Sequence, residues 1–385
     1  MKQYEIAVIG GGMVGAATAL GLAKQGRNVV LVEPYPPRSF SVDQPMDLRV
    51  SAISHQSVTL LNELGAWDSI KSMRVCPYSR LETWEIDSCR TRFNSAALGL
   101  DSLGYIAENR VIQLGLWQQF SAFENLTVIE SGALDSIALT DEQHQISLVD
   151  GTLFSASWVV GADGANSKVR DIAGIGVTAW DYRQECMLIN VTTEKPQQDI
   201  TWQWFTPSGP RSFLPLPGHK GSLVWYDSPK RIRQLKSMDN KRLQEEIETH
   251  FPNELGGVEV EQVGSFPLTR RHAQQYFKQR CILVGDSAHT INPLAGQGVN
   301  LGFKDVAQLL KVTEQEQGLS EGAARAYQWA RKPDNLLMQT GMDIFYKGFK
   351  ESFPPLMLAR NALLKVAENA GPLKKRILKY AIGLN

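Results

Sequence analysis

The chain has 385 residues, 43% of them hydrophobic, and its forty basic residues are balanced by forty acidic ones. A chain of this length can bury a sizeable core, and the usual size of a domain predicts two or three of them. Balanced charge produces no overall field that would gather nucleic acid or steer a strongly charged substrate, so we expect no nucleic-acid partner. Specificity must therefore come from a shaped pocket.

Neither the cysteines nor the N-terminus indicates a metal-binding, secreted or membrane-spanning protein. The cysteines lack the spacing of a metal site or a redox pair, so we expect free thiols and no metal. They are Cys76, Cys89, Cys186 and Cys281. The N-terminus has no features of a secretion signal, and no apolar stretch reaches about 18 residues. We expect a cytoplasmic protein.

The first 33 residues predict a β-α-β unit. Residues 4–9 are apolar and β-branched, glycines then break the run, and small apolar residues recur at helical spacing from Ala16 to Ala23. A second apolar run, 28–32, closes at Glu33. This order predicts a strand, a tight turn, a helix and a second strand.

The glycines of this unit, Gly10, Gly12 and Gly15, have the Gly-x-Gly-x-x-Gly spacing of a dinucleotide-binding turn. Such a turn lets backbone N–H groups and the helix N-terminus approach a pyrophosphate without side chains in the way. Glu33 is placed to accept hydrogen bonds from an adenosine ribose. The alternative is a tight turn that only packs the helix on the strand.

The next part of the chain predicts short elements. We expect a helical stretch around 58–64 and a second helix over 105–122. Three short strands then predict a small antiparallel appendage followed by a buried strand. They are 126–130, 145–148 and 158–160. The last strand runs into the segment GADGANSKVR, which carries Asp163.

Residues from about 183 to 268 predict a second layer rich in β structure. The predicted strands are 187–191, 202–205, 212–216, 223–225 and 263–267. Aromatic residues at strand spacing in this layer either pack the sheet or line an apolar tunnel. They are Trp202, Trp204, Phe205, Phe213, Trp225 and Tyr226.

An apolar strand returns at 281–284 and is followed by a helical pattern from Val299 to about Leu310. The first domain is thereby re-entered, which predicts discontinuous domains. The connecting loop is rich in glycine and carries Gly285, Asp286, Pro293, Gly296, Gly298 and Asn300.

Three motifs occur in a fixed order along the chain: the dinucleotide fingerprint, the Asp-Gly pair at Asp163 and the Gly-Asp pair at Asp286. In this order and spacing the chain resembles the single-component flavoprotein aromatic hydroxylases, the group typified by para-hydroxybenzoate hydroxylase. The resemblance covers essentially the whole chain and implies FAD as cofactor.

The resemblance implies an α/β fold. We expect a Rossmann-like FAD-binding domain carrying the GxGxxG, DG and GD motifs, an inserted, mainly antiparallel β-sheet substrate domain, and a helical C-terminal tail. The expected FAD-binding domain comprises residues 1–78, 104–182 and 276–330, and the substrate domain comprises 79–103 and 183–275. The C-terminal helical region is expected over 331–385.

The resemblance also implies roles around the flavin. Asp286 would hydrogen-bond the ribityl chain, and the loop from Pro293 to Asn300 would run beside the isoalloxazine. A helix beginning near Gly298 would aim its positive end at flavin N1 and C2=O, where charge accumulates on reduction. Gly296 and Gly298 permit that close approach.

The segment DLRVSAIS, residues 47–54, is similar to a signature of the ubiquinone-biosynthesis hydroxylases, in which its arginine, here Arg49, lies near the flavin. The alternative for Arg49 is a structural ion pair. The implied reaction is hydroxylation of the ring of a polyprenyl benzoquinol, a demethoxy-quinol. Rival readings are a sister hydroxylase acting at another ring carbon, a flavin halogenase suggested by Trp202-Gln203-Trp204, and a flavin subunit without catalysis.

The chemistry implied by the family needs three reactants besides the substrate: FAD, O2 and a reduced nicotinamide, NADH or NADPH. Hydride passes to flavin N5, O2 adds at C4a, and the hydroperoxide delivers its distal oxygen to the ring. The Pro293 carbonyl is the candidate that hydrogen-bonds the peroxide. His289 is a candidate general base, with a structural histidine as the alternative.

Two residues depart from the family pattern or from helix rules. Ser287 stands where these enzymes usually have alanine, and its hydroxyl could reach the flavin or Asp286. Pro333 falls in a helix-like stretch, where it should start or kink a helix.

The C-terminal tail contains two amphipathic segments with basic residues, about 356–369 and 373–382. They could lie peripherally on the inner face of an anionic membrane, or against a multiprotein complex of ubiquinone biosynthesis that presents the lipid-soluble substrate. The alternative is a tail docked on its own domain with a solvated basic face.

Overall fold

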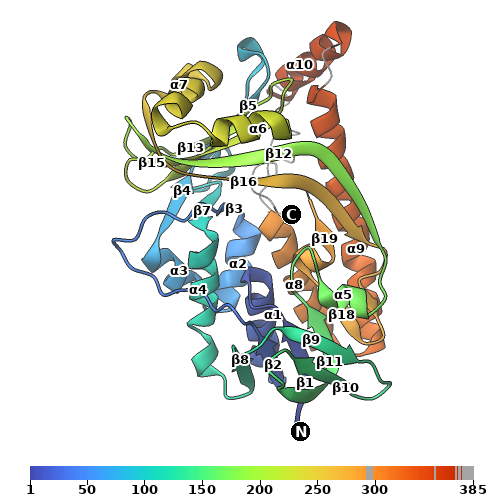
Figure 1. Ribbon diagram of the computed structural model, residues 1–385. Coiled ribbons are helices and arrows are strands. Elements are labelled where there is room, and N and C mark those ends of the chain that lie inside the picture. The colour runs from blue at the N-terminus through green and yellow to red at the C-terminus, as the bar shows by residue number, and fades with distance from the viewer. Residues whose placement is uncertain (292–297, 351–352, 369–370, 372–373, 375–385) are drawn as a thin grey trace.

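The computed structural model describes residues 1–291, 298–350, 353–368, 371 and 374. It contains two eight-stranded sheets, one three-stranded sheet and helices that pack against them (Figure 1). The expected α/β class is confirmed, including the antiparallel second sheet and the helical C-terminal region.

The first sheet has a parallel centre built around β1 (Lys2–Ile9). On one side β1 pairs with β2 (Val29–Val32), which pairs with β8 (Leu126–Ile129). On the other it pairs with β11 (Leu153–Gly161), which pairs with β18 (Cys281–Leu283). A central parallel strand is covered on both faces, so the fully apolar run at the end of β1 is buried.

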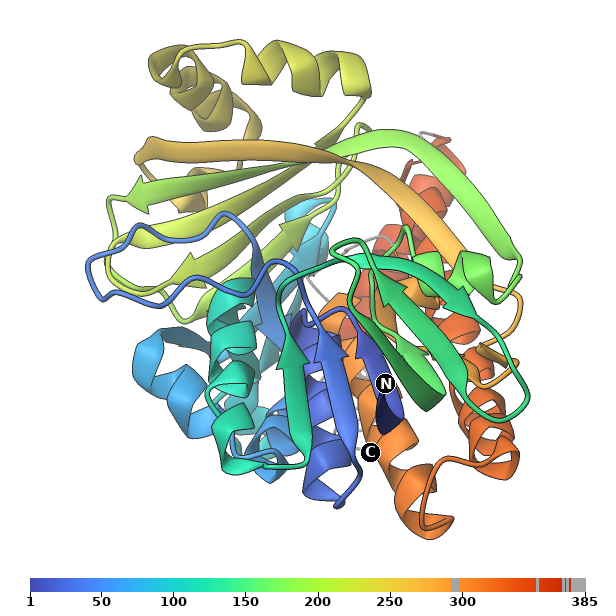
Figure 2. The same ribbon diagram turned by 60° about the horizontal axis from the view of Figure 1, so that its bottom comes forward.

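Helix α1 (Met13–Lys24) connects β1 to β2 and confirms the β-α-β unit. It contacts α4 (Asn109–Trp117) on one side and α8 (Gly298–Gln315) on the other, and these helices cover one face of the sheet (Figure 2). α1 is almost wholly buried because small residues face both neighbours.

Two expectations for the middle of the chain are partly wrong. Residues 105–108 belong to β7 (Gly104–Glu108), the central strand of the three-stranded sheet between β3 (Val50–Ile53) and β4 (Val75–Tyr78), and only then does α4 begin. The strand at 126–129 joins the parallel sheet. Only β9 (Leu134–Ala138) and β10 (His144–Leu148) form an antiparallel extension of β11. In both cases pairing with distant strands decides the structure. Periodicity alone does not distinguish a helix from a strand in a short apolar run, nor which strand that run pairs with.

Two long antiparallel strands, β12 (Val177–Thr193) and β16 (Val258–Ala273), run from the second sheet down beside the first (Figure 1). The second sheet has the order β19-β16-β12-β15-β14-β13-β5-β6. Its other strands are β5 (Arg80–Trp84), β6 (Thr91–Asn94), β13 (Ile200–Trp204), β14 (Arg211–Leu216), β15 (Lys220–Asp227) and β19 (His289–Thr290).

The two faces of the second sheet have different partners. Two helices that the sequence did not predict, α6 (Pro229–Lys236) and α7 (Asn240–His250), cover one face, and Trp202, Phe213 and Trp225 pack there. Tyr226 points to the opposite face, because side chains alternate along a strand, and clusters with residues of β4 and β7. For those three aromatics sheet packing is therefore the correct interpretation.

The C-terminal region forms α9 (Glu321–Lys350) and α10 (Pro354–Glu368). Pro333 lies inside α9, so it does not start a helix. No helix in the described parts of the chain combines the length and apolar character needed to cross a bilayer. The remaining elements are α2 (His55–Glu63), α3 (Trp67–Met73), α5 (Lys168–Ile172), β17 (Phe277–Lys278) and five short 3-10 turns.

The four cysteines are free, as expected, and Cys76, Cys186 and Cys281 are buried. Burial raises the pKa of Cys76 and of Cys281 to about 12, so these thiols stay protonated at neutral pH. They behave as small apolar core residues.

Candidate functional site

The glycine turn after β1 is closely packed at two positions and open at the third. A Cβ on Gly15 would lie 1.8 Å from the Gly10 carbonyl oxygen, and Gly10 itself has φ +100°. Around Gly12 no atom from the described part of the chain would lie within 4 Å of a Cβ. Gly12 is also the N-cap of α1, and no side chain of the described residues caps the first N–H groups of the helix. This is the geometry of an anion site at a helix N-terminus.

Glu33, at the end of β2, is held against this turn. Its Oε2 accepts a hydrogen bond from the Gly11 N–H at 2.7 Å, and its Oε1 accepts one from the Tyr35 N–H at 2.9 Å. The Gly11 carbonyl in turn accepts from Gln113 and Trp117 of α4, two contacts that the sequence did not predict. The carboxylate is therefore fixed at the edge where a ribose was expected.

Asp163 lies beside the same turn, because a Cβ on Gly10 would meet Ala162 and Asp163. The Oδ2 atom accepts a hydrogen bond from the Val169 N–H at 3.1 Å. Its Oδ1 atom is buried and has no hydrogen-bond partner in the described part of the chain. Burial raises the pKa of this carboxyl. An orphaned buried acceptor next to an anion-binding turn indicates that a further donor belongs there.

The Gly285-Asp286 turn is brought to α1 by close packing. Gly285 has φ +59°, and Val14 of α1 fits between Gly285 and Gly302 of α8. Asp286 is exposed to solvent yet surrounded by much of the molecule, and this loss of hydration raises the pKa of its carboxyl. His289 and Arg49 are near enough to oppose that shift. All three sequence motifs therefore meet at the start of α1.

Arg49 projects from the segment before β3 toward the second sheet. Its carbonyl accepts a hydrogen bond from the Asn109 N–H at 3.0 Å, and its guanidinium carbon lies 5.3 Å from the ring centre of Phe266. The side chain is exposed, and among the described residues it forms no ion pair. The alternative of a structural ion pair is thus not what the described residues show.

The side chain of Asn300 joins α8 to the β3–α2 connection. Its Oδ1 accepts hydrogen bonds from the Ser54 N–H at 3.0 Å and the Ser57 hydroxyl at 2.7 Å, and its Nδ2 donates to the Ala52 carbonyl at 2.7 Å. Gly298 begins α8, and no atom of the described residues would lie within 4 Å of a Cβ there. Pro293 and Gly296 lie outside the described residues.

A buried carboxylate that the sequence analysis missed organises this region. Asp305 of α8 is fully buried and accepts from the Gly285 N–H at 3.0 Å, His289 Nε2 at 2.5 Å, Arg331 Nε at 2.8 Å and Asn335 Nδ2 at 3.0 Å. Burial alone would raise its pKa, but His289 and Arg331 outweigh that effect and lower it to about 2. The sequence feature that could have revealed Asp305 is a charged residue inside the apolar pattern of 299–310.

The Ser287 hydroxyl could have reached the flavin or Asp286, and the structure shows it bonded elsewhere than to Asp286. The hydroxyl is fully buried, lies 2.6 Å from the Gly161 carbonyl and 2.8 Å from the Val284 carbonyl, and accepts from the Val284 N–H at 3.1 Å. It joins the ends of β11 and β18. The Asp286 alternative was wrong because the turn rotates this side chain into the core.

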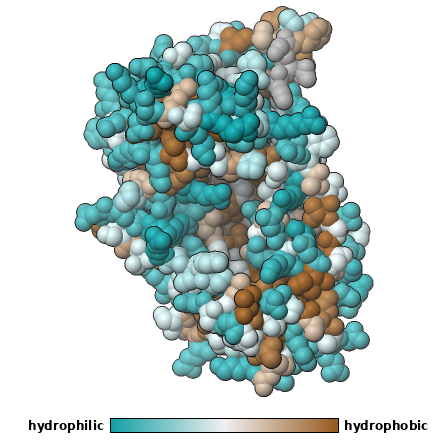
Figure 3. Space-filling model, viewed as in Figure 1, coloured by the Kyte–Doolittle hydropathy of each residue, from teal (hydrophilic) through white to brown (hydrophobic). Residues whose placement is uncertain are grey.

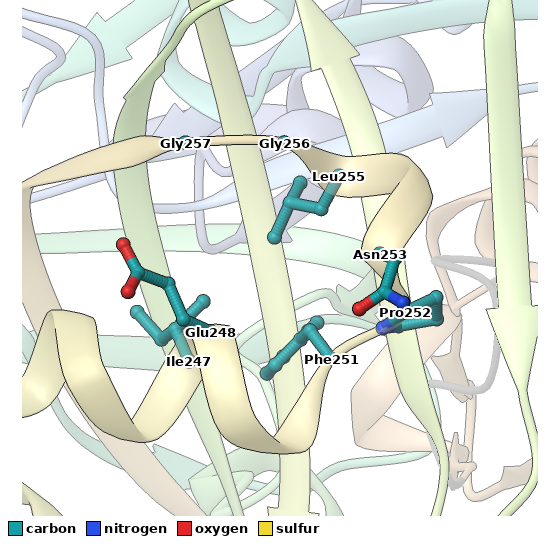
Figure 4. Close-up of a pocket in the computed structure, with 8 residues that line it drawn as sticks. All are labelled: Ile247, Glu248, Phe251, Pro252, Asn253, Leu255, Gly256 and Gly257. Atoms are coloured by element: carbon teal, nitrogen blue, oxygen red, sulfur yellow. The ribbon is translucent and has the colours of Figure 1, made fainter.

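Arg49 lies over Phe266, which packs against the cluster on the inner face of the second sheet, and Figure 3 shows the surface hollowed between the two sheets. A separate small pocket lies on the α7 side of the second sheet, lined by Phe251, Leu255 and Glu248 (Figure 4). Phe251 and Leu255 belong to the core beneath α6 and α7, so that pocket is on the opposite face from the motifs.

Comparison with known proteins agrees with this geometry. Residues 3–318 match the model of a family described as FAD binding domain. The chain is 51% identical to 3-demethoxyubiquinol 3-hydroxylase of Escherichia coli K12 over 100% of this chain and 99% of that one. It is 32% identical to ubiquinone hydroxylase UbiL of Rhodospirillum rubrum, over 99% and 90%. The crystal structure of p-nitrophenol 4-monooxygenase from Pseudomonas putida DLL-E4 superposes with TM-score 0.82 at 21% identity, over 100% and 99%.

Proposed function

From the membership of this chain in the FAD-binding-domain family, we propose that it hydroxylates the ring of a polyprenyl demethoxy-benzoquinol in ubiquinone biosynthesis. The protein is an FAD-dependent monooxygenase. The observation that carries the choice of substrate is the 51% identity, over the whole chain, to a 3-demethoxyubiquinol 3-hydroxylase.

The residues present fit FAD. The open space at Gly12, the uncapped start of α1 and the orphaned Oδ1 of Asp163 form a cradle for a pyrophosphate and its neighbouring hydroxyl groups. Glu33 lies at the ribose edge of that cradle, and Asp286, beside Gly285, has no side-chain partner in the described part of the chain. When bound, the flavin supplies the redox chemistry that activates O2 with electrons from NADH or NADPH.

The chain's own residues would orient the reactants and keep water out. Asp286 would accept hydrogen bonds from the ribityl chain, and Arg49 would hold positive charge near the flavin ring. Gly298 would bring the N-terminus of α8 to the pyrimidine edge of the flavin. We propose that Pro293 and Gly296 also belong to the loop beside the flavin. The side chain of Asn300 fixes α8 to β3. Asn300 would therefore contribute to the flavin site through its backbone.

We assign His289 a supporting role in place of general-base catalysis. Its ring is buried, its Nε2 is bonded to Asp305, and the ring of Tyr276 stacks beside it. A histidine in such a network holds the Gly285-Asp286 turn in place. Substrate deprotonation would need the other ring nitrogen to reach the substrate.

Because the proposed substrate is lipid-soluble, the proposal includes how the enzyme meets it. A polyprenyl quinol resides in a membrane, so the enzyme would meet it peripherally at the bilayer or through a complex of the ubiquinone pathway. The tail is the segment that we propose makes this contact.

A complementation experiment tests the function. The gene is expressed in bacteria lacking their own 3-demethoxyubiquinol 3-hydroxylase, and quinones are extracted; we expect the demethoxy species to disappear and ubiquinone to return. The purified protein should carry flavin and couple nicotinamide oxidation to ring hydroxylation. Persistent 3-demethoxyubiquinol with a flavin-loaded protein would point to another ring carbon. A protein that takes up no FAD, or whose flavin no donor reduces, would contradict the oxygenase assignment.

A further inference from the structure

Helix α10 is docked on the second sheet by polar side chains. Arg360 forms a two-pronged ion pair with Glu85, at the end of β5, with Nε 2.7 Å from Oε2 and Nη2 in contact with Oε1. Asn361 donates to the same carboxylate at 2.6 Å, and both charged side chains are only 8% exposed. The expectation of a solvated basic face is therefore wrong for Arg360.

Further contacts fix the rotation of the helix about its own axis. The Thr91 hydroxyl donates to the Leu364 carbonyl at 3.0 Å, and the Arg92 N–H donates to Glu368 at 2.7 Å. Leu364 is buried in a small cluster with Phe205 and Phe349. Because one side of α10 is held at several points, the opposite side must face outward.

The outward side of α10 is apolar, the reverse of an ordinary surface helix. Its large side chains are 41–68% exposed: Leu356, Leu358, Leu363 and Val366, preceded by Phe353 at 64%. At 100° per residue the helix residues span an arc of about 160°, completed by exposed Ala359 and Ala362 and bordered by Lys365. Figure 3 shows hydrophobic surface at the upper end of the molecule, where Figure 1 places α10.

From this arrangement we propose that the outer face of α10, with Phe353, is a docking surface for an anionic lipid bilayer. The inference rests on the proposed function, and of the two routes to the polyprenyl quinol given there it takes the bilayer. An apolar helix face bordered by lysine is the kind that lies in a bilayer interface.

Charge favours a bilayer over a second copy of the chain. Residues 354–385 contain six basic residues and one acidic residue, in a chain that is neutral overall. With the charge of Arg360 offset by Glu85, an excess of four positive charges remains (five minus one). Two such segments facing each other would repel, whereas anionic headgroups attract them. An apolar helix face in a segment with this net positive charge fits an anionic bilayer.

The test uses the full-length, FAD-loaded protein and co-sedimentation with vesicles of phosphatidylcholine, with or without phosphatidylglycerol. We expect binding to the vesicles that contain phosphatidylglycerol, and a loss of about tenfold or more in partitioning for the double variant Leu358→Glu, Leu363→Glu. The matched control is Leu153→Glu, an equally exposed leucine on β11, which should bind like the wild type.

Several outcomes would overturn the proposal. They are no sedimentation of the wild type, preference for phosphatidylcholine alone, equal binding by the double variant, or a wild-type dimer that the double variant converts to a monomer. Hydroxylation of a water-soluble short-chain quinol separates this question from the proposed function. The double variant should keep that activity; vesicle binding without any hydroxylation would instead contradict the function alone.

Discussion

Arg331 of α9 donates its Nε to Oδ1 of Asp305 of α8 at 2.8 Å, and the two side chains are 8% and 0% exposed. The other oxygen of Asp305 accepts from Gly285 and His289. One buried carboxylate therefore links α9 to the turn that carries Asp286. The position of that turn depends on residues more than forty positions away in sequence.

Replacing Arg331 should destabilise the protein far more than replacing an exposed arginine of the same helix. Arg331→Ala leaves the buried Asp305 charge short of a donor, and we expect the free energy of unfolding to fall by about 3–5 kcal/mol. The control is Arg325→Ala, whose pair with Glu321 is 62% and 65% exposed. That pair should be worth less than about 1 kcal/mol. Urea unfolding measures the free energy of unfolding of both variants. Equal losses would contradict the conclusion that the buried Asp305 carboxylate depends on Arg331.

The same carboxylate should make stability depend on acid pH. The pKa of Asp305 is about 2 in the folded protein against an ordinary 3.8. A depressed folded-state pKa contributes stability above the ordinary value, and that contribution is lost as pH falls from about 4 toward 2. We expect Asp305→Asn to remove about 2 kcal/mol of this pH dependence, at 1.36 kcal/mol per pKa unit. Identical unfolding profiles between pH 5 and 2 would contradict it.

Asp286→Asn should stabilise the protein without FAD against unfolding and weaken its binding of FAD. Enclosure raises the pKa of this carboxyl, so at neutral pH its charge is less favourable in the folded state than in the unfolded one. Loss of charge-assisted hydrogen bonds should raise the Kd for FAD by about tenfold or more. Fluorescence titration and thermal unfolding of the apo protein check the two parts. Asp101→Asn, an exposed change elsewhere, should alter neither, and unaltered FAD affinity in Asp286→Asn would remove Asp286 from the site.

Gly12 and Gly15 should respond differently to alanine. Gly12 has φ −63° and an open surrounding, so Gly12→Ala should fold normally and lose FAD affinity by about tenfold or more, since its methyl group would occupy the cofactor's space. Gly15→Ala places a Cβ 1.8 Å from the Gly10 carbonyl oxygen and should disrupt the turn itself. Circular dichroism and flavin content distinguish the two. A Gly12→Ala protein that binds FAD normally would place the pyrophosphate elsewhere.

Ser287→Ala tests the corrected position of the hydroxyl. Because the hydroxyl joins β11 to β18, its loss should lower the free energy of unfolding by about 1–2 kcal/mol. The absorption spectrum of the bound flavin should stay unchanged. A shifted spectrum with unaltered stability would mean that the hydroxyl faces the cofactor after all.

The local parts of the site were predictable from sequence because they obey local rules. The glycine spacing, Glu33 at the end of the second strand and the apolar strands before Asp163 and Asp286 each depend on a few neighbouring residues. Periodicity likewise predicted α1, residues 187–191 of β12, and α8. It failed at residues 105–108 and missed α6 and α7, where pairing and packing with distant segments decide the structure.

By itself, the sequence determined the class of fold, the FAD family and the residues of the three motifs, since each is encoded in a contiguous stretch. Only the tertiary structure decided that Asp305, Arg331 and Asn335 support the Gly285 turn, and that α10 is docked by Arg360 with its leucines outward. Hydrophobic patterning shows that a helix has an apolar side but not which way that side faces. That direction is set by buried ion pairs whose partners lie far apart in the chain.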